Sequence, residues 1–186
     1  METVLDSWKL SWTRGRPAAQ LYLSTVYALP RFSSGTLHSV FTGWQASGIV
    51  KILSSSYMSL SSGIDNALSG TNDQTPNQVL ASPYSANRTV DHWLNPAAFA
   101  QPATGTYGNM GQRNIVGPGF IGIDMGLTRK FQVHERQSVE FRAEAFNLPN
   151  HVNPFNPVTT LTSTTFGKIQ SANDPRILQL ALKYVF

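Results

Sequence analysis

The last eleven residues of the chain, Arg176–Phe186, constrain its fold more than any other stretch. Apolar residues occupy alternate positions there: Leu178, Leu180, Leu182, Tyr184 and Phe186. Residues two apart share one face of an extended strand, whereas the intervening positions, which include Gln179 and Lys183, form the other face. A strand of about 10 residues with one apolar face and an aromatic end has the dimensions of a transmembrane β-strand. An edge strand of a soluble sheet can alternate in the same way, so other features have to decide.

Five other stretches alternate and predict further strands: Ser7–Thr13, Gln20–Leu29, Gly43–Leu53, Phe120–Val133 and Ser138–Asn147. In the last of these, Glu140, Arg142 and Glu144 share one face. Unpaired charge is costly to bury, and a hydrated lumen would supply both water and partners for these groups. We therefore predict an all-β chain, whose antiparallel up-and-down strands form the carboxy-terminal part of a transmembrane β-barrel with long external loops.

The alternation also assigns charged residues to the face that would line the lumen: Lys51, Asp124, Glu140, Arg142, Glu144 and Lys183. No apolar run reaches the 18 residues that suggest a transmembrane helix. Charged residues make up only 13% of the chain, which is low for a soluble domain. The net charge is +4, but the basic residues are scattered, so we expect no nucleic-acid partner.

The lengths of the connections between predicted strands form a second pattern. If the carboxy terminus is periplasmic, as the resemblance described below implies, the long connections 54–119 and 148–175 are external. The short connections at Pro30–Thr42 and His134–Gln137 are then internal. The expected ligand contacts are in the external segments Ser54–Gly119 and Asn150–Asp174. The same arrangement puts a set of aromatic residues near the inner ends of the strands, as in an interfacial belt: Trp8, Tyr27, Trp44, Phe131, Phe141, Tyr184 and Phe186.

Motifs for catalysis or cofactor binding are weak. The histidines His38, His92, His134 and His151 are isolated, and the chain has no cysteine, so no zinc spacing emerges. The segment Gly117–Gly122 fits G-x-G-x-x-G, but a strand pattern follows it where a dinucleotide site needs a helix. We interpret that segment as a junction between loop and strand, and expect neither enzymatic activity nor a cofactor.

Several short motifs follow one another in a specific order: Leu94–Ala100, Gly105–Asn109, Gly111–Ile115, Gly117–Phe120, Phe141–Asn147, Phe166–Ile169 and Asp174–Arg176. In this order and spacing, the chain resembles the carboxy-terminal end of TonB-dependent outer-membrane receptors of the Oar-like type, most strongly from about Arg88 to Phe186. The resemblance implies a location in the bacterial outer membrane and contact with its lipid.

The same resemblance implies further partners. The barrel-assembly machinery would recognise the terminal strand, through Leu182, Tyr184 and Phe186. The remainder of a receptor chain would complete the barrel, and TonB would be contacted only through an amino-terminal part. An unknown ligand would bind to the external loops.

Receptors of this family carry an amino-terminal regulatory domain of the carboxypeptidase type, a plug and a large barrel. Here we expect residues 1–186 to form a partial barrel domain without signal peptide, plug or regulatory domain, and an open, curved sheet if the chain stands alone. Two alternatives remain. One is a small secreted, soluble β-protein that binds a glycan or an apolar ligand. The other is a hydrolase with Glu140 and Glu144 as paired carboxylates, although Arg142 between them favours a charge ladder.

Overall fold

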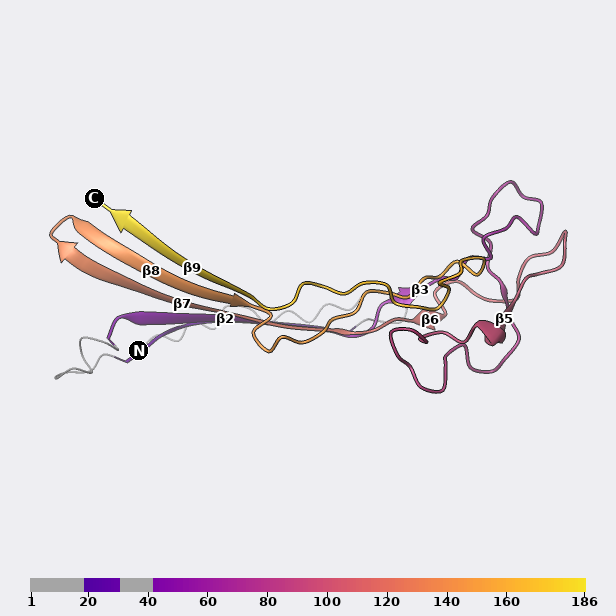
Figure 1. Cartoon of the computed structure of the whole chain (residues 1–186), viewed down its shortest axis with the longest axis horizontal. Helices are drawn as coiled ribbons and strands as arrows, with labels where there is room; N and C mark the ends of the chain where they lie inside the picture. Colours follow the sequence, from indigo (N-terminus) through magenta and orange to yellow (C-terminus); the bar gives the residue numbers. More distant parts are fainter. Residues whose placement is uncertain (1–18, 31–41) are drawn as a thin grey trace. The chain divides into compact units, whose positions relative to one another are not determined.

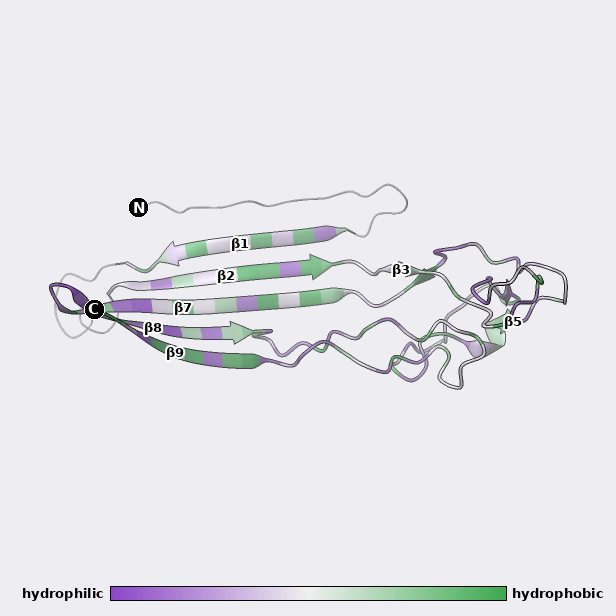
Figure 2. Ribbon diagram, turned by 90° about the horizontal axis from the view of Figure 1, so that it is seen from above, coloured by the Kyte–Doolittle hydropathy of each residue, from purple (hydrophilic) through white to green (hydrophobic). Residues whose placement is uncertain are grey.

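The computed structural model describes residues 19–30 and 42–186. It contains a five-stranded antiparallel sheet in which neighbours along the chain are neighbours in the sheet (Figures 1 and 2). The strands, in sheet order, are β1 (Gln20–Ala28), β2 (Trp44–Leu53), β7 (Phe120–His134), β8 (Gln137–Phe146) and β9 (Ile177–Val185). The predicted all-β, up-and-down fold is confirmed. The predicted strand Ser7–Thr13 lies outside the described residues.

The strands form where the sequence alternates, and each bound differs from the expected one by a single residue at most. The turn between β7 and β8 is as tight as the sequence predicts, because His134 pairs directly with Gln137 and leaves two residues to turn the chain. The register shifts between Gln132 and His134, which marks a β-bulge beside this turn.

Within the described residues the sheet is open, and β1 and β9 stand at the two ends of its strand order. The helical structure in this part of the chain is one 3₁₀ turn, η1 (Pro96–Ala98). No helix among the described residues is long and apolar enough to cross a membrane.

The chain forms two compact units. The five strands belong to the first, called here the sheet unit, whose described residues are 19–30, 42–53, 120–152 and 174–186. The second, the loop unit, combines Ser54–Gly119 with Asn153–Asn173. It contains short strands paired two by two: β3 (Tyr57–Met58) with β6 (Ile115–Val116), and β4 (Asn77–Gln78) with β5 (Phe99–Ala100).

The loop unit has a buried apolar core. Its members come from irregular segments and very short strands: Met58, Leu60, Leu94, Ala98, Phe99, Met110, Ile115 and Phe166. Backbone hydrogen bonds join the two segments, as from Ser61 N–H to the Thr159 carbonyl at 3.0 Å and from Ile169 N–H to the Val90 carbonyl at 2.7 Å. The sequence shows no sustained alternation here, since a core built from irregular backbone leaves no periodic signal.

Candidate functional site

The sheet unit has two chemically different faces. The register puts alternate residues of neighbouring strands on the same side of the sheet, and on one of the two sides most of these residues are apolar. Val50 lies opposite both Leu23 and Ile123, and Ala143 lies opposite both Leu127 and Leu180. We call this the apolar face. The opposite side, which carries Lys51, Thr128, Glu140 and Lys183, is called the polar face. Alternating bands along the strands in Figure 2 follow the same pattern.

All six charged residues assigned to the lumen from the sequence share the polar face: Lys51, Asp124, Glu140, Arg142, Glu144 and Lys183. They come from β2, β7, β8 and β9, so only the register could show that they share a face. That this face lines a lumen remains a prediction.

Charges of opposite sign meet across three strands near the β7–β8 turn. Glu140 lies directly opposite Lys130 on β7 and Lys183 on β9. The Nε of Arg142, two residues further along β8, donates to Oε1 of Glu140 at 2.7 Å. Because the Arg142 side chain is half exposed, this pair contributes no more than about 1 kcal/mol to stability in water.

A shallow hollow of about 290 Å³ lies on the polar face over the middle of β1, β2, β7 and β8. Gly126 keeps it open, since a Cβ there would come within 2.7 Å of Ser47 Oγ. Two carboxylates, of Asp124 and Glu144, line the hollow together with apolar groups such as Ile49. Asp124 also accepts the backbone N–H of Asn147 at 2.8 Å, and this bond supports the end of β8.

Lys51 illustrates how the polar face accommodates a cation at the other end of β2. Its Nζ lies 5.7 Å from the Tyr22 ring centroid and 5.2 Å from that of Phe120. Gly122, which lies opposite Lys51, leaves room for the Phe120 ring, since a Cβ there would come within 2.8 Å of it. Such contacts contribute about 0.5–1 kcal/mol each when exposed.

The three residues predicted as the membrane-assembly signal follow one another along the apolar face of β9. Leu182, Tyr184 and Phe186 are exposed by 74%, 54% and 92% respectively. The rings of Tyr184 and Phe186 lie 6.1 Å apart. The structure thus presents these side chains outward, but their recognition by an assembly machinery remains a prediction.

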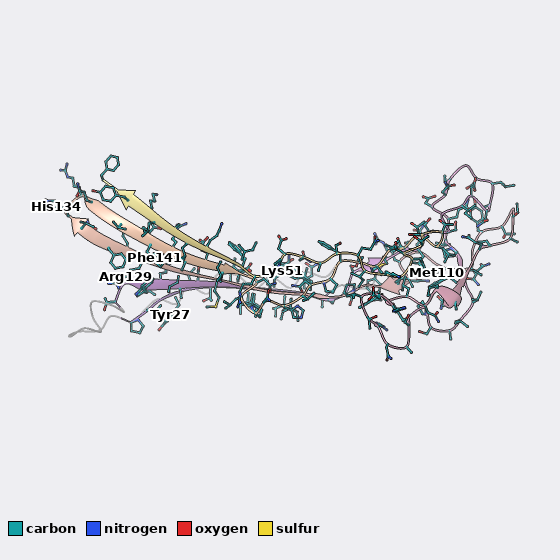
Figure 3. The ribbon with its side chains drawn as sticks, in the orientation of Figure 1. Tyr27, Lys51, Met110, Arg129, His134 and Phe141 are labelled. Carbon is teal, nitrogen blue, oxygen red and sulfur yellow. The ribbon has the colours of Figure 1, made fainter. Side chains whose placement is uncertain are left out.

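The aromatic residues of the predicted belt lie at the end of the sheet that holds the β7–β8 turn, and on the apolar face. Tyr27, Trp44, Phe131, Phe141 and Tyr184 are there by register, while Trp8 lies outside the described residues. One member of this region escaped the sequence analysis. Arg129 lies opposite both Trp44 and Phe141, on the apolar face. Figure 3 shows Arg129 and Phe141 toward the same end of the sheet as His134. Counting alternate residues along β7 in the sequence would have assigned Arg129 to the same face as Leu127 and Phe131.

The loop unit holds a small polar cluster around Asp65. This carboxylate accepts the backbone N–H groups of Ser69 at 2.9 Å and Gly70 at 2.7 Å, and also the side-chain amide of Gln74. The hydrogen bond from Ser69 is the largest cause that holds the pKa of Asp65 below its ordinary value of 3.8, while partial desolvation opposes it. Because each of these donors belongs to the protein, the cluster fixes a loop.

No group of three or more metal-ligating side chains occurs in the described part of the chain. His92, His134 and His151 are exposed, whereas His38 lies outside the described residues. Gly117–Gly119 links the short strand β6 to β7, in agreement with its interpretation as a junction between loop and strand.

Several motif residues have structural roles in the loop unit. Asn95 Oδ1 caps η1 by accepting the N–H of Ala97 at 3.1 Å. Gly167 has a φ of +77° and approaches Leu94 so closely that a Cβ would lie 2.9 Å from the leucine side chain. Asn109 N–H donates to Asn77 Oδ1 at 2.8 Å, which links the Gly105–Asn109 motif to β4. The spacing of these motifs therefore reflects the packing of one compact unit.

Comparison with known proteins identifies a family. The model of the outer membrane beta barrel domain family matches residues 17–179, which is most of the chain. Neither the curated proteins nor the solved structures contain a significant match. The matched range includes β1, β2, β7 and β8 and the whole loop unit. The chain therefore belongs to the outer membrane beta barrel domain family and is a protein of the bacterial outer membrane.

Proposed function

We propose that this chain forms the carboxy-terminal strands and external loops of a TonB-dependent outer-membrane receptor of the Oar-like type, and that it has no catalytic activity. The order of short motifs from about Arg88 to Phe186 supports this finer assignment within the outer-membrane barrel proteins. Several of these motifs pack together in the loop unit, which explains why their order and spacing carry information.

The observation that carries the proposal is the open, two-faced sheet. Its five described strands alternate between an apolar face, suited to lipid, and a polar face with seven charged residues, suited to a hydrated lumen. Among the described strands, β1 and β9 end the sheet order. An unpaired edge is unfavourable in a membrane because its backbone groups lack partners, and a barrel completed by the remainder of a receptor chain would pair any such edge.

The proposed partners follow from this arrangement. Outer-membrane lipid would cover the apolar face, and the barrel-assembly machinery would recognise Leu182, Tyr184 and Phe186. TonB would be contacted only through an amino-terminal part of the receptor. The unknown transported ligand would bind to Ser54–Gly119 and Asn150–Asp174, where connecting segments, rather than strands, provide the surface.

The experiment is an immunoblot of fractionated source cells with an antibody against Arg176–Phe186. We expect a band several times larger than 20.4 kDa in the outer membrane. Formaldehyde cross-linking of the same cells should then shift this band into a complex that an antibody against TonB also detects. A membrane band that never cross-links to TonB would overturn the receptor assignment while leaving the barrel intact. A 20.4 kDa band in the soluble fraction would instead favour the small secreted binding protein.

A further inference from the structure

Arg88 extends from a short segment of the loop unit whose backbone is tied on both sides of it. Tyr84 and Leu94 pair at the base of this segment as an antiparallel bridge. At its tip, Thr89 and His92 exchange two backbone hydrogen bonds, of 3.3 Å and 3.2 Å, which close a tight two-residue turn. The backbone that carries Arg88 is therefore fixed by the loop unit itself.

Two aromatic rings beside Arg88 are held by a single residue of β6. The Tyr84 hydroxyl group accepts the backbone N–H of Val116 at 2.8 Å, and Trp93 Nε1 donates to the carbonyl of Val116 at 3.2 Å. Both side chains also pack against the buried apolar core of the loop unit. The two rings are thus in place before any ligand arrives, which lowers the entropy that binding would cost.

The guanidinium of Arg88 lies over these two rings. Its central carbon is 3.9 Å from the ring centroid of Tyr84 and 5.8 Å from that of Trp93. Such contacts between a cation and a ring face orient the guanidinium without using its N–H groups in conventional hydrogen bonds. Arg88 itself is exposed. We call Arg88, Tyr84 and Trp93 the Arg88 platform.

The charge of Arg88 has no counter-ion among the described residues. The carboxylates of the loop unit are those of Asp65, Asp73 and Asp91. Asp65 accepts hydrogen bonds within its own loop, and none of the three forms an ion pair with Arg88. In the described part of the chain, the recorded contacts of the Arg88 side chain are its two rings. Its five N–H donors are therefore accessible to a ligand.

We propose that the Arg88 platform binds an anionic group of a ligand, either a carboxylate or a phosphate ester. The planar fork of a guanidinium matches two oxygens of such a group at once, and the rings keep the fork in one orientation. This inference rests on the proposed function, in which ligands contact Ser54–Gly119, and it adds the chemical class of the ligand.

The platform and the receptor assignment can fail separately. Absence of cross-linking to TonB would overturn the assignment to a receptor but would leave anion binding by Arg88 unaffected. A platform that binds no anion would in turn leave the barrel and its TonB contact standing. An arginine with a purely structural role would cover the rings equally well, but no anion would protect it from a reagent.

The first experiment measures the reactivity of Arg88 toward phenylglyoxal, a reagent that modifies accessible guanidinium groups. The full protein is used in purified outer membranes with both sides open, so that the orientation of the loop unit does not matter. Mass spectrometry of peptides compares Arg88 with Arg113, another exposed arginine of the same unit. The probes are glucuronate, glucose 6-phosphate and glucose at equal ionic strength; they share a sugar ring and differ in the anionic group.

We expect saturating glucuronate, glucose 6-phosphate or both to slow the modification of Arg88 by at least about five-fold, because a bound anion occupies its N–H groups. Glucose should give no protection, and the modification of Arg113 should stay unchanged with every probe. Protection by one anion alone would identify the recognised group as a carboxylate or as a phosphate ester. Protection by both would show that the platform accepts either.

The second experiment titrates the protecting probe by ligand-observed NMR against detergent-solubilised protein. Only protein with heat-modifiable mobility in gels, a sign of a folded barrel, is analysed. Arg88→Gln should weaken binding by at least about ten-fold, since charge-assisted hydrogen bonds are lost. Arg88→Lys should give an intermediate loss, because an ammonium group lacks the planar fork. Arg113→Gln is the matched control: it removes the same charge from the same unit and should bind as the parent does.

Several results would overturn the proposal. One is that neither anion protects Arg88, and another is that Arg113 is protected to the same degree, which would show a general effect of ions. Equal protection by glucose would mean that the sugar ring, and not the anion, is bound. Unchanged binding by Arg88→Gln, or an Arg88 that does not react with phenylglyoxal in the absence of any probe, would also contradict an accessible anion site.

Discussion

The sheet unit and the loop unit place their apolar residues in opposite ways. Every buried hydrophobic residue found among the described residues lies in the loop unit, where Leu60, Leu94 and Ile115 are almost inaccessible. In the sheet unit, by contrast, many large apolar side chains are exposed, most of them along the apolar face, where Leu180 is 76% exposed. The loop unit therefore buries apolar side chains in its own core, whereas the sheet unit leaves them accessible.

This difference indicates that the two units are in contact with different surroundings: water for the loop unit, and an apolar medium for one face of the sheet unit. A core excluded from water is what stabilises an ordinary domain, and the loop unit has one despite its irregular backbone. Exposed apolar patches of this extent are rare on soluble monomers and mark a surface that lipid or protein covers. Because the chain belongs to the outer membrane beta barrel domain family, we infer that membrane lipid covers the apolar face of the sheet unit. The predictions below test each half of the comparison.

The largest expected effect is in the core of the loop unit. Phe99 is buried and packs edge to face on Phe166, with ring centroids 5.4 Å apart. Phe99→Ala should destabilise this unit by about 3–5 kcal/mol, since it removes apolar contacts and leaves a cavity. Limited proteolysis of intact outer membranes should then cleave within Ser54–Gly119, while the barrel keeps its heat-modifiable mobility.

Tyr107→Ala is the control for this variant, because its side chain belongs to the same unit but is 70% exposed. It should change the cleavage rate little. Equal protection of the Phe99→Ala and parent proteins would mean that the loop unit does not depend on this core.

A charge on the apolar face should have the next largest effect. Leu180 lies opposite Ala143 in the middle of β9, so Leu180→Arg should cost about 2–4 kcal/mol of stability in a bilayer. The amount of heat-modifiable protein in the outer membrane should fall. Gln179→Arg, one residue away on the polar face, introduces the same charge and should leave that amount nearly unchanged. If Gln179→Arg lowered the amount of heat-modifiable protein more than Leu180→Arg did, the assignment of the two faces would be contradicted.

The smallest effect concerns pH and the Asp65 cluster. Hydrogen bonds from Ser69, Gly70 and Gln74 lower the pKa of Asp65 in the folded state below 3.8. Its contribution to stability is therefore complete above about pH 4 and is lost as the pH falls through the folded-state value. Hydrogen exchange at the Ser69 and Gly70 amides should accelerate on acidification in the parent. In Asp65→Asn, exchange should already be faster at neutral pH, and this acid-dependent step should disappear.

The strands were predictable from the sequence because alternation is a local property. Each of the five observed strands begins and ends within one residue of its predicted bounds, and the tight turn before Gln137 lies where the alternation of apolar residues stops. The six charged candidates also share one face, as expected, because parity within each strand is fixed once the strand pairs. The loop unit was missed as a compact unit, since Leu60, Leu94 and Phe166 come from distant segments without periodicity.

The sequence by itself therefore determined which segments are strands and which side chains share a face within each strand. It also predicted a membrane β-protein, which the family match confirmed. Only the tertiary structure decided what lies side by side across strands and segments. It brought Arg129 between Trp44 and Phe141, and it packed two separate connections around one buried core. The physical reason is that alternation is encoded in neighbouring residues, whereas register and core packing depend on contacts between residues far apart in the chain.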